Sequence, residues 1–319
     1  KDYEVKRYWD LPIVENKHEV NEDEEKIKIK SLLESAVQYR MISDVPLGAF
    51  LSGGLDSSII VSIMAKLSSK PIKTYTIGFS EKGFNEFEYA KAVAEYYKTD
   101  HHEIMLSVDN YLDYMEKMIK IKDAPLAVPN EIALHQLSKE LKKDISVVLS
   151  GEGADELFGG YGRIFRSAFD YLRVKNKNFS RSNEFEKNII DKYGNLDFQG
   201  ELEHFLSQYS YMNFSQKNEM FQTSFSTSLR SDPHNVKFFS SYWEKLSNLE
   251  LHDKFIWIFQ KVHLEGLLGR LDSSTMSASV EGRSPFVDHR LIEAVNSLPL
   301  SLKMKWKSSE EYLKAELLN

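Results

Sequence analysis

The chain has 319 residues, enough for one large core or two smaller ones, and its 42% hydrophobic and 28% charged residues are typical of a globular protein. Its net charge of −7 argues against a general nucleic-acid surface, which needs clustered Lys and Arg, although a small anion could still be held locally. The chain contains no cysteine, which excludes disulfides, thiolate zinc sites and cysteine nucleophiles.

The first half of the sequence alternates helix and strand patterns. Apolar residues at helical spacing predict a helix that begins at Glu24 and ends before Pro46. Apolar, β-branched and aromatic runs predict strands at 46–52, 72–79, 101–107 and 145–151. Helical spacing predicts the intervening helices at 57–67, 87–97, 110–121 and 129–143. Such an alternation indicates parallel βαβ units with right-handed crossovers, and therefore an α/β fold with a parallel sheet.

The second half is predicted to be largely helical, with a boundary near Gly162. Residues 164–250 are rich in Asn, Ser, Phe and Tyr, show no internal repeat, and suggest helices with mobile connections. From Asp253 to Leu318 the helical periodicity returns, interrupted by "RSPFVDHR" and "SLPLSLK".

Two polar, glycine-rich loops follow predicted strands. "FLSGGLDSS" closes the first strand, and "LSGEGADELFGGYGR" closes the strand that ends at Leu149. Ligands of parallel sheets bind outside the carboxyl ends of the strands, so we expect the two loops to face a common crevice.

The chemistry of the first loop suits phosphate oxygens. Gly53 and Gly54 allow a close approach of the backbone, and the following helix directs its free N–H groups at the same place. Three hydroxyl groups add donors, those of Ser52, Ser57 and Ser58. Asp56 would repel a phosphate unless a divalent cation such as Mg²⁺ lay between them. The alternative is an ordinary strand-to-helix turn with an Asp or Ser N-cap, and a Walker loop is excluded because no Lys follows the glycines.

The string "SGGLDSS" resembles the signature of the PP-loop ATP pyrophosphatases, which cleave ATP between the α and β phosphates. The motifs "LSGEGADELFGGY", "LLGRLDSSTMSASVEGRSPFVD" and "YWD" narrow this to a resemblance, across most of the chain, to the synthetase domain of glutamine-dependent asparagine synthetase. The resemblance implies an adenine nucleotide α-hydrolase-like sandwich with a largely helical C-terminal half. It also implies the use of ATP and Mg²⁺ to adenylate the side-chain carboxylate of aspartate, after which ammonia displaces AMP to give asparagine.

The resemblance carries over residue by residue. The residues that match the family's ATP and pyrophosphate contacts are Leu51, Ser52, Gly53, Gly54, Asp56, Ser57, Ser58, Ile77, Gly78, Ser150 and Gly151. Glu152 resembles the acidic residue beside the adenylate, where a carboxylate could accept a proton from ammonia. Asp155 resembles a second magnesium or aspartate-site carboxylate, so Asp56 and Asp155 are the implied metal ligands and, with Glu152, the implied catalytic residues. For Asp155 and Glu156 the alternative is a pair of helix-start carboxylates.

The remaining polar candidates have structural alternatives. Asp123 and Asn130 lie where the family has its amino-acid recognition segment, and a capped helix start explains them equally well. The other candidates for substrate binding are Tyr161, Asp272, Glu281 and Arg283. For the last three, together with Arg270, we favour a buried ion-pair network that docks the helical half on the sheet. His101 and His102 lack a third ligand at metal spacing, so no zinc site is predicted.

The resemblance also predicts a domain organisation. Residues 1–20 would be a linker from an N-terminal glutaminase domain absent from the chain, 21–162 the ATP-binding core, and 163–319 the helical part, with a variable insertion at about 164–250. Without a cysteine the chain cannot hydrolyse glutamine by the family's route, and it stops ahead of a family segment with a phosphate-contacting lysine. The expected small-molecule partners are aspartate and ammonia, and a homodimer is left open.

Several alternatives remain at this point. A related amidotransferase could act on a sugar acid or an amino-acid derivative, and the chain could be a catalytically incomplete ATP-binding fragment or assembly module. A tRNA-modifying PP-loop enzyme is disfavoured by the acidic charge balance and the absence of cysteine. No apolar run approaches the roughly 18 residues of a membrane span, and no signal-peptide layout begins the sequence, so we expect a cytoplasmic protein without membrane contact.

Overall fold

The computed structural model describes residues 3–15, 17, 19–79, 85–106, 111–126, 128–212, 216, 219–220 and 233–304. The chain divides into two compact units. The first, here the sheet unit, comprises Val20–Leu157 and Val262–Val295. The second, here the helical unit, comprises Lys1–Glu19, Phe158–Lys261 and Asn296–Asn319. Residues 262–295, which the sequence analysis grouped with the helical half, thus fold with the sheet.

The sheet unit is built on five strands in the order β3-β2-β1-β4-β5, and every neighbouring pair is parallel. The strands are β1 (Leu47–Phe50), β2 (Lys73–Phe79), β3 (Asp100–Leu106), β4 (Val147–Leu149) and β5 (Glu281–Arg283). The central strand β1 pairs Ala49 with Thr74 of β2 and with Leu149 of β4. The predicted parallel α/β fold is therefore confirmed.

The fifth strand was not predicted. It has three residues, two of them charged, so neither length nor apolar content marks it in the sequence. It is defined by pairing instead, because Leu149 of β4 is in register with Arg283.

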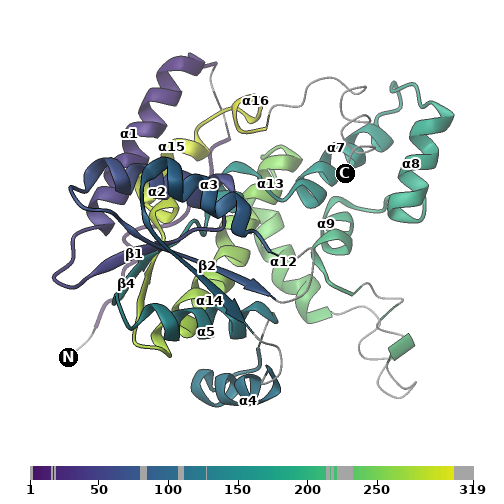
Figure 1. The fold of residues 1–319 in the computed structure, drawn as a ribbon. Helices are drawn as coiled ribbons and strands as arrows, with labels where there is room; N and C mark the ends of the chain where they lie inside the picture. Colours follow the sequence, from purple (N-terminus) through teal and green to yellow (C-terminus); the bar gives the residue numbers. More distant parts are fainter. Residues whose placement is uncertain are drawn as a thin grey trace. The chain divides into compact units, whose positions relative to one another are not determined.

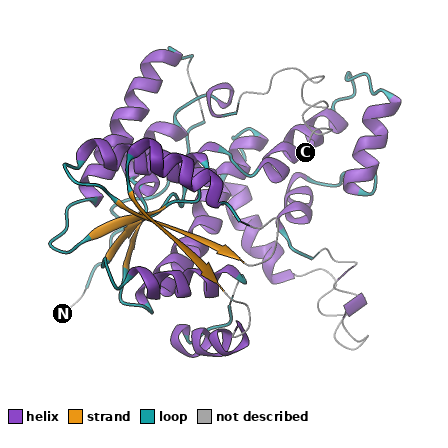
Figure 2. Ribbon diagram, in the orientation of Figure 1, coloured by secondary structure: helices purple, strands orange, loops and turns teal. Residues whose placement is uncertain are grey.

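Helices cover both faces of the sheet (Figures 1 and 2). The helices of this unit are α1 (Glu22–Arg40), α2 (Leu55–Leu67), α3 (Phe87–Tyr97), α4 (Tyr111–Lys122), α5 (Asn130–Leu141), α6 (Ala154–Phe158), α14 (Leu264–Met276) and α15 (His289–Asn296), with the 3₁₀ turn η2 (Pro285–Val287). In Figure 1, α2 and α3 lie above the sheet and α5 below it, with α4 outside α5. The core between the sheet and α5 includes Tyr75, Val148 and Leu141.

Helix α1 begins two residues before the predicted start at Glu24 and, as predicted, ends before Pro46. It begins at Glu22 because the Asn21 side chain accepts the amide of Asp23 at 3.0 Å and so caps the helix. It ends at Arg40, well before Pro46, where the Arg283 guanidinium donates to the carbonyls of Arg40 and Ile42, both at 2.8 Å. A side chain of β5 thus satisfies the carbonyl groups at the end of α1.

The helical unit gathers the aromatic residues of the second half. Its helices are α7 (Gly162–Lys175), α8 (Asn183–Tyr193), α9 (Glu201–Tyr209), α12 (Pro233–Lys245), α13 (Leu251–Ile258) and α16 (Leu300–Lys303), and the π-helix η1 (Phe259–His263) follows α13. Phe205 of α9 is fully buried, and its ring lies 4.9 Å from that of Phe255 and 5.2 Å from that of Tyr209. Aromatic packing therefore explains the unusual composition of this region. No helix in the described ranges has the length and apolar character that a membrane span requires.

One carboxylate ties α1 to α15 in the sheet unit. Asp288 is buried, and it accepts from Arg40 at 3.1 Å and from the Arg290 Nε at 2.9 Å. Burial alone would raise the pKa of Asp288, but hydrogen bonds from Arg290 and Arg40 outweigh it and lower that pKa to about 2. The charged form is therefore the one that the fold stabilises.

We expect Asp288→Asn to destabilise the sheet unit by roughly 3 kcal/mol, because it leaves two guanidinium groups without their shared partner. A depressed pKa contributes stability above the unfolded value of 3.8 that is lost as the pH falls through about 2. Urea unfolding of both proteins at pH 7 and at pH 2.5 measures this. The difference in the free energy of unfolding between the two proteins should be smaller at pH 2.5 than at pH 7. An equal difference at both pH values would contradict the stabilising role of the ionised Asp288.

Candidate active site

The two glycine-rich loops lie at the point where the strand order reverses. Strand β2 pairs with one edge of β1, and β4 pairs with the opposite edge of β1. The loop 51–54 follows β1 and the loop 150–153 follows β4, so both leave the carboxyl ends of adjacent strands. Crevices at such reversal points are the usual ligand sites of parallel sheets.

The first loop turns sharply because Gly53 adopts φ +81°. A Cβ atom at this position would lie 2.4 Å from the backbone carbon of Tyr89 and 2.5 Å from the amide nitrogen of Ala90, both in α3. Gly54 has φ −66°, and a Cβ there would approach only the Ser52 hydroxyl, at 3.2 Å. The position that strictly requires glycine is therefore Gly53, because both its conformation and the adjacent helix exclude a side chain.

The serines of this loop bond to one another and to the loop backbone. The Ser52 and Ser57 hydroxyl oxygens are 3.0 Å apart, the Gly54 amide donates to the Ser52 hydroxyl at 3.2 Å, and the Ser58 hydroxyl donates to the Gly54 carbonyl at 2.7 Å. No side chain caps α2. Its first amides, those of Leu55, Asp56 and Ser57, find no acceptor in the described structure. An uncapped helix start of this kind is suited to an anion.

The second loop closes against the first through Gly151. A Cβ at Gly151 would lie 3.1 Å from the Asp56 Cβ and 3.1 Å from the Ser57 amide nitrogen, so the loops are in contact. The Ser150 amide donates to the Arg283 carbonyl at 2.8 Å, and the Ser150 hydroxyl accepts the Glu152 amide at 3.2 Å. The structure thus brings the predicted residues of the two loops into one site.

Asp56 and Asp155 are two carboxylates in the first turns of the helices after the two loops, and they interact electrostatically. Burial raises the pKa of Asp56, and the charge of Asp155 raises it further. Burial likewise raises the pKa of Asp155. Neither side chain has a hydrogen-bond or ion-pair partner anywhere in the described ranges. Two half-buried carboxylates without a cationic partner fit a divalent cation, although no group of three or more potential ligands occurs among the described residues.

The end of β2 supplies the next two candidates. Gly78 is buried, and a Cβ there would lie 2.2 Å from the Phe87 ring and 2.6 Å from the Asn85 side-chain oxygen. Asn85 also accepts the Phe79 amide at 2.6 Å, which fixes the loop after the strand. Ile77 is partly buried and packs on the core beneath the sheet.

Glu152 has a partner that the sequence analysis did not assign to it. The Arg270 guanidinium of α14 donates to the Glu152 carboxylate at 2.5 Å and reaches the Asn130 side-chain oxygen at 3.5 Å. Both members of the ion pair are largely shielded, with side chains 14% and 22% exposed. A pair 118 residues apart in sequence leaves no local pattern, so only the fold could reveal it.

The favoured ion-pair network is only partly present. Arg283 does pair with Glu281, at 2.8 Å, but the other donors of Arg283 serve the end of α1 within the same unit. Arg270 pairs with Glu152, and Asp272 is exposed. The network is therefore corrected to two separate groups within the sheet unit.

The other substrate candidates belong to neither loop. Asp123 is exposed and has φ +52°, and Asn130 is the first residue of α5. Tyr161 belongs to the helical unit, where its ring packs 5.3 Å from that of Phe259. Asn130 is linked toward the site through Arg270, which reaches its side-chain oxygen at 3.5 Å.

Comparison with known proteins agrees with this geometry. The family model described as asparagine synthase matches residues 28–317. Asparagine synthetase [glutamine-hydrolyzing] 3 of Bacillus subtilis is 30% identical over 318 residues, covering 93% of this chain and 46% of that protein. A putative asparagine synthetase [glutamine-hydrolyzing] 2 of Methanocaldococcus jannaschii is 40% identical over 159 residues, covering 48% of this chain and 30% of that protein.

A third relative, a putative asparagine synthetase [glutamine-hydrolyzing] of Mycobacterium bovis, is 30% identical over 328 residues and covers 99% of this chain and 48% of that protein. The chain thus spans about half the length of the curated relatives it matches. Because the family match extends over most of the sequence and includes both glycine-rich loops, the chain belongs to the asparagine synthase family.

Proposed function

We propose that this chain forms asparagine from aspartate, ATP and ammonia. An oxygen of the aspartate side-chain carboxylate attacks the α-phosphorus of ATP, and the bond to the β-phosphate breaks to release pyrophosphate. The nitrogen of ammonia then attacks the acyl carbon, and AMP leaves with the bridging oxygen. The observation that carries the proposal is the contact of two glycine-rich loops at the reversal point of the sheet, where the charge of Asp155 acts on Asp56.

The first loop is proposed to hold the pyrophosphate end of ATP. The uncapped start of α2 presents its free amides, and the hydroxyls of Ser52, Ser57 and Ser58 can turn toward phosphate oxygens. We assign the adenine and ribose contacts to Ile77, Gly78, Ser150 and Gly151, and Leu51 to the pyrophosphate loop. Asp56 and Asp155 would hold Mg²⁺, which when bound would neutralise charge on the departing pyrophosphate.

Glu152 is proposed to accept the proton that ammonia loses as the amide bond forms. Arg270 then acts as a positioning residue, because its guanidinium fixes the carboxylate at 2.5 Å and is itself anchored on α14.

Replacing Arg270 by Gln should reduce turnover by roughly tenfold to a hundredfold, with a smaller loss in Arg270→Lys. Because Arg270 is proposed to act through Glu152, the double variant Arg270→Gln/Glu152→Gln should be no slower than Glu152→Gln alone. Steady-state rates of the parent and the four variants form the test. If the losses of turnover in the two single variants multiply in the double variant, the positioning role of Arg270 is contradicted.

We further propose that the longer protein supplies ammonia from a glutaminase domain ahead of this chain. The names of the relatives include glutamine hydrolysis, and this chain spans about half of their length. Residues 1–20 would then connect that domain to the ATP-binding core at 21–162, with 163–319 as the helical part. The reaction would take place in the cytoplasm, where ATP and aspartate are available.

The experiment is pyrophosphate release from ATP and Mg²⁺ in the presence of ammonium and aspartate, compared with a panel of other carboxylic acids. Release that depends on aspartate, with asparagine and AMP as products, is the expected result. Release with a sugar acid or an amino-acid derivative in place of aspartate would move the substrate assignment to that acid. ATP binding without release with any acid would contradict the catalytic proposal.

A further inference from the structure

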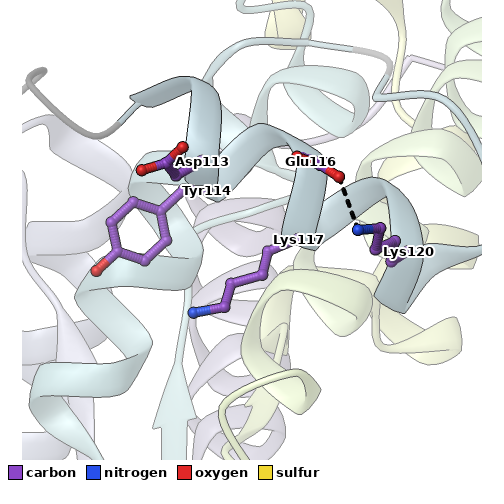
Figure 3. Close-up of a pocket in the computed structure, with 5 residues that line it drawn as sticks. All are labelled: Asp113, Tyr114, Glu116, Lys117 and Lys120. Atoms are coloured by element: carbon purple, nitrogen blue, oxygen red, sulfur yellow. Dashed lines mark hydrogen bonds and ion pairs between the residues drawn. The ribbon is translucent and has the colours of Figure 1, made fainter.

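Helix α4 carries a pocket away from the two glycine-rich loops (Figure 3). Its volume is roughly 360 Å³, and its lining residues are Asp113, Tyr114, Glu116, Lys117 and Lys120. The function proposed above uses none of them. The pocket therefore needs its own explanation.

The helix that forms the pocket is held firmly at its two ends. The Tyr111 hydroxyl donates to the Pro129 carbonyl at 3.2 Å, and Lys122 pairs at 2.7 Å with Glu131, whose side chain is fully buried. Between these ties, Met118 is completely buried on the face of α4 toward the protein. The pocket thus has a fixed wall, which preorganises any ligand contacts.

The charges around the pocket are unevenly compensated. Glu116 is neutralised by Lys120 at 2.7 Å. Lys117 has no carboxylate within ion-pairing distance among the described residues, and the same holds for Lys139 of α5. In Figure 3, Tyr114 and Lys117 project to the same side of the helix, and Asp113 lies beside Tyr114. Two ammonium groups are thus left without a counter-ion.

Both ammonium groups converge on the Tyr114 ring. The Nζ atoms of Lys117 and Lys139 lie 5.8 Å and 5.5 Å from its centroid. The His135 ring, buried on α5, lies 6.2 Å from the same ring. Burial lowers the pKa of His135, and the charges of Lys139 and Lys117 lower it further, consistent with a positive potential at this place. These two unpaired positive charges stand out in a chain whose net charge is −7.

We propose that a small dianion, such as a phosphate or dicarboxylate group, binds at the edge of this pocket, where Lys117 of the lining and Lys139 of α5 both lie near the Tyr114 ring. Lysine ammonium groups act as point charges, so they select for charge more than for a particular oxyanion geometry. The Tyr114 hydroxyl can donate a hydrogen bond to the same ligand. This binding is independent of ATP binding at the glycine-rich loops.

The test is a titration of the protein, labelled with ¹³C-tyrosine, with inorganic phosphate and separately with succinate at constant ionic strength. The Tyr114 resonance is assigned by its loss in Tyr114→Phe, and it reports on this pocket even when phosphate also occupies the loops. We expect a saturable shift of that resonance. In Lys117→Gln/Lys139→Gln the apparent affinity should fall by roughly tenfold, as expected for two partly exposed charge contacts.

The matched control is Lys142→Gln/Lys143→Gln, which removes the same charge just beyond the C-terminal end of α5 and should change the affinity less than twofold. Binding of phosphate but not succinate would support a phosphate-bearing ligand, and comparable binding of both would support recognition by charge alone. An unmoved Tyr114 resonance, a shift reproduced by sodium chloride, or equal losses in the two double variants would overturn the proposal.

Discussion

Alanine at position 53 should unfold the first loop and abolish turnover. The side chain would clash with the backbone of α3 at Tyr89 and Ala90, which cannot move as a flexible side chain can. It would also require an L-residue to hold φ +81°. The left-handed conformation costs roughly 1–2 kcal/mol and overpacking roughly 1–3 kcal/mol, so we expect a combined loss of about 2–5 kcal/mol. Urea unfolding and the pyrophosphate assay measure the two effects.

Gly54→Ala provides the neighbouring control for this experiment. Its backbone is already in a region open to all residues, and the added Cβ would meet only the Ser52 hydroxyl, at 3.2 Å. The stability of Gly54→Ala should therefore lie within roughly 1 kcal/mol of the parent. Its rate should fall, because the loop backbone is proposed to contact the phosphates. Equal destabilisation of the two variants would contradict the role assigned to α3.

Replacing Asp56 by Asn should separate activity from stability. If Asp56 helps to hold Mg²⁺ at the departing pyrophosphate, turnover should fall by roughly 10²–10³-fold. The fold should at the same time become more stable, because Asn removes one of two like charges that face each other in a half-buried site. Glu140→Gln, an exposed change on α5, is the control and should alter neither quantity appreciably.

The gain in stability should depend on pH with a definite sign. The pKa of Asp56 is raised above its ordinary value of 3.8 in the folded state, so the native protein binds this proton more tightly than the unfolded chain does. Ionisation therefore costs stability as the pH rises past about 4. Melting temperatures of Asp56→Asn and the parent should converge below about pH 4 and differ most at neutral pH. A variant that melts lower than the parent at neutral pH would contradict the proposed repulsion.

The features predicted best from the sequence are the helices and strands that one continuous segment defines. Strand and helix periodicities identified β1, β2, β3 and β4 and their helices, because each is defined by the side chains of one continuous segment. The α3 helix was predicted at its observed bounds, Phe87–Tyr97. The parallel sheet and the position of both loops after their strands followed from the same kind of reasoning, whereas the family followed from the resemblance of the loop motifs.

The features that were not predicted depend on contacts between residues far apart in the sequence. The strand β5 exists because Arg283 lies in register with Leu149, and Arg283 completes the end of α1 more than 240 positions away in the sequence. Likewise, Arg270 meets Glu152 only after α14 returns to the sheet unit. A charged residue without a local partner could be assigned to a substrate or to another side chain equally well from sequence alone.

The return of residues 262–295 to the sheet also affects how the protein is made. During synthesis the ribosome releases β4 more than 130 residues before β5, so the emerging sheet has an unpaired edge at β4 while the intervening helices are produced. Such a long-range pairing slows folding and exposes an edge to other chains in the meantime. Because the two units alternate along the sequence, a single cut cannot release either one whole. Truncations near residue 157 should therefore yield aggregating proteins instead of a smaller, folded ATP-binding core.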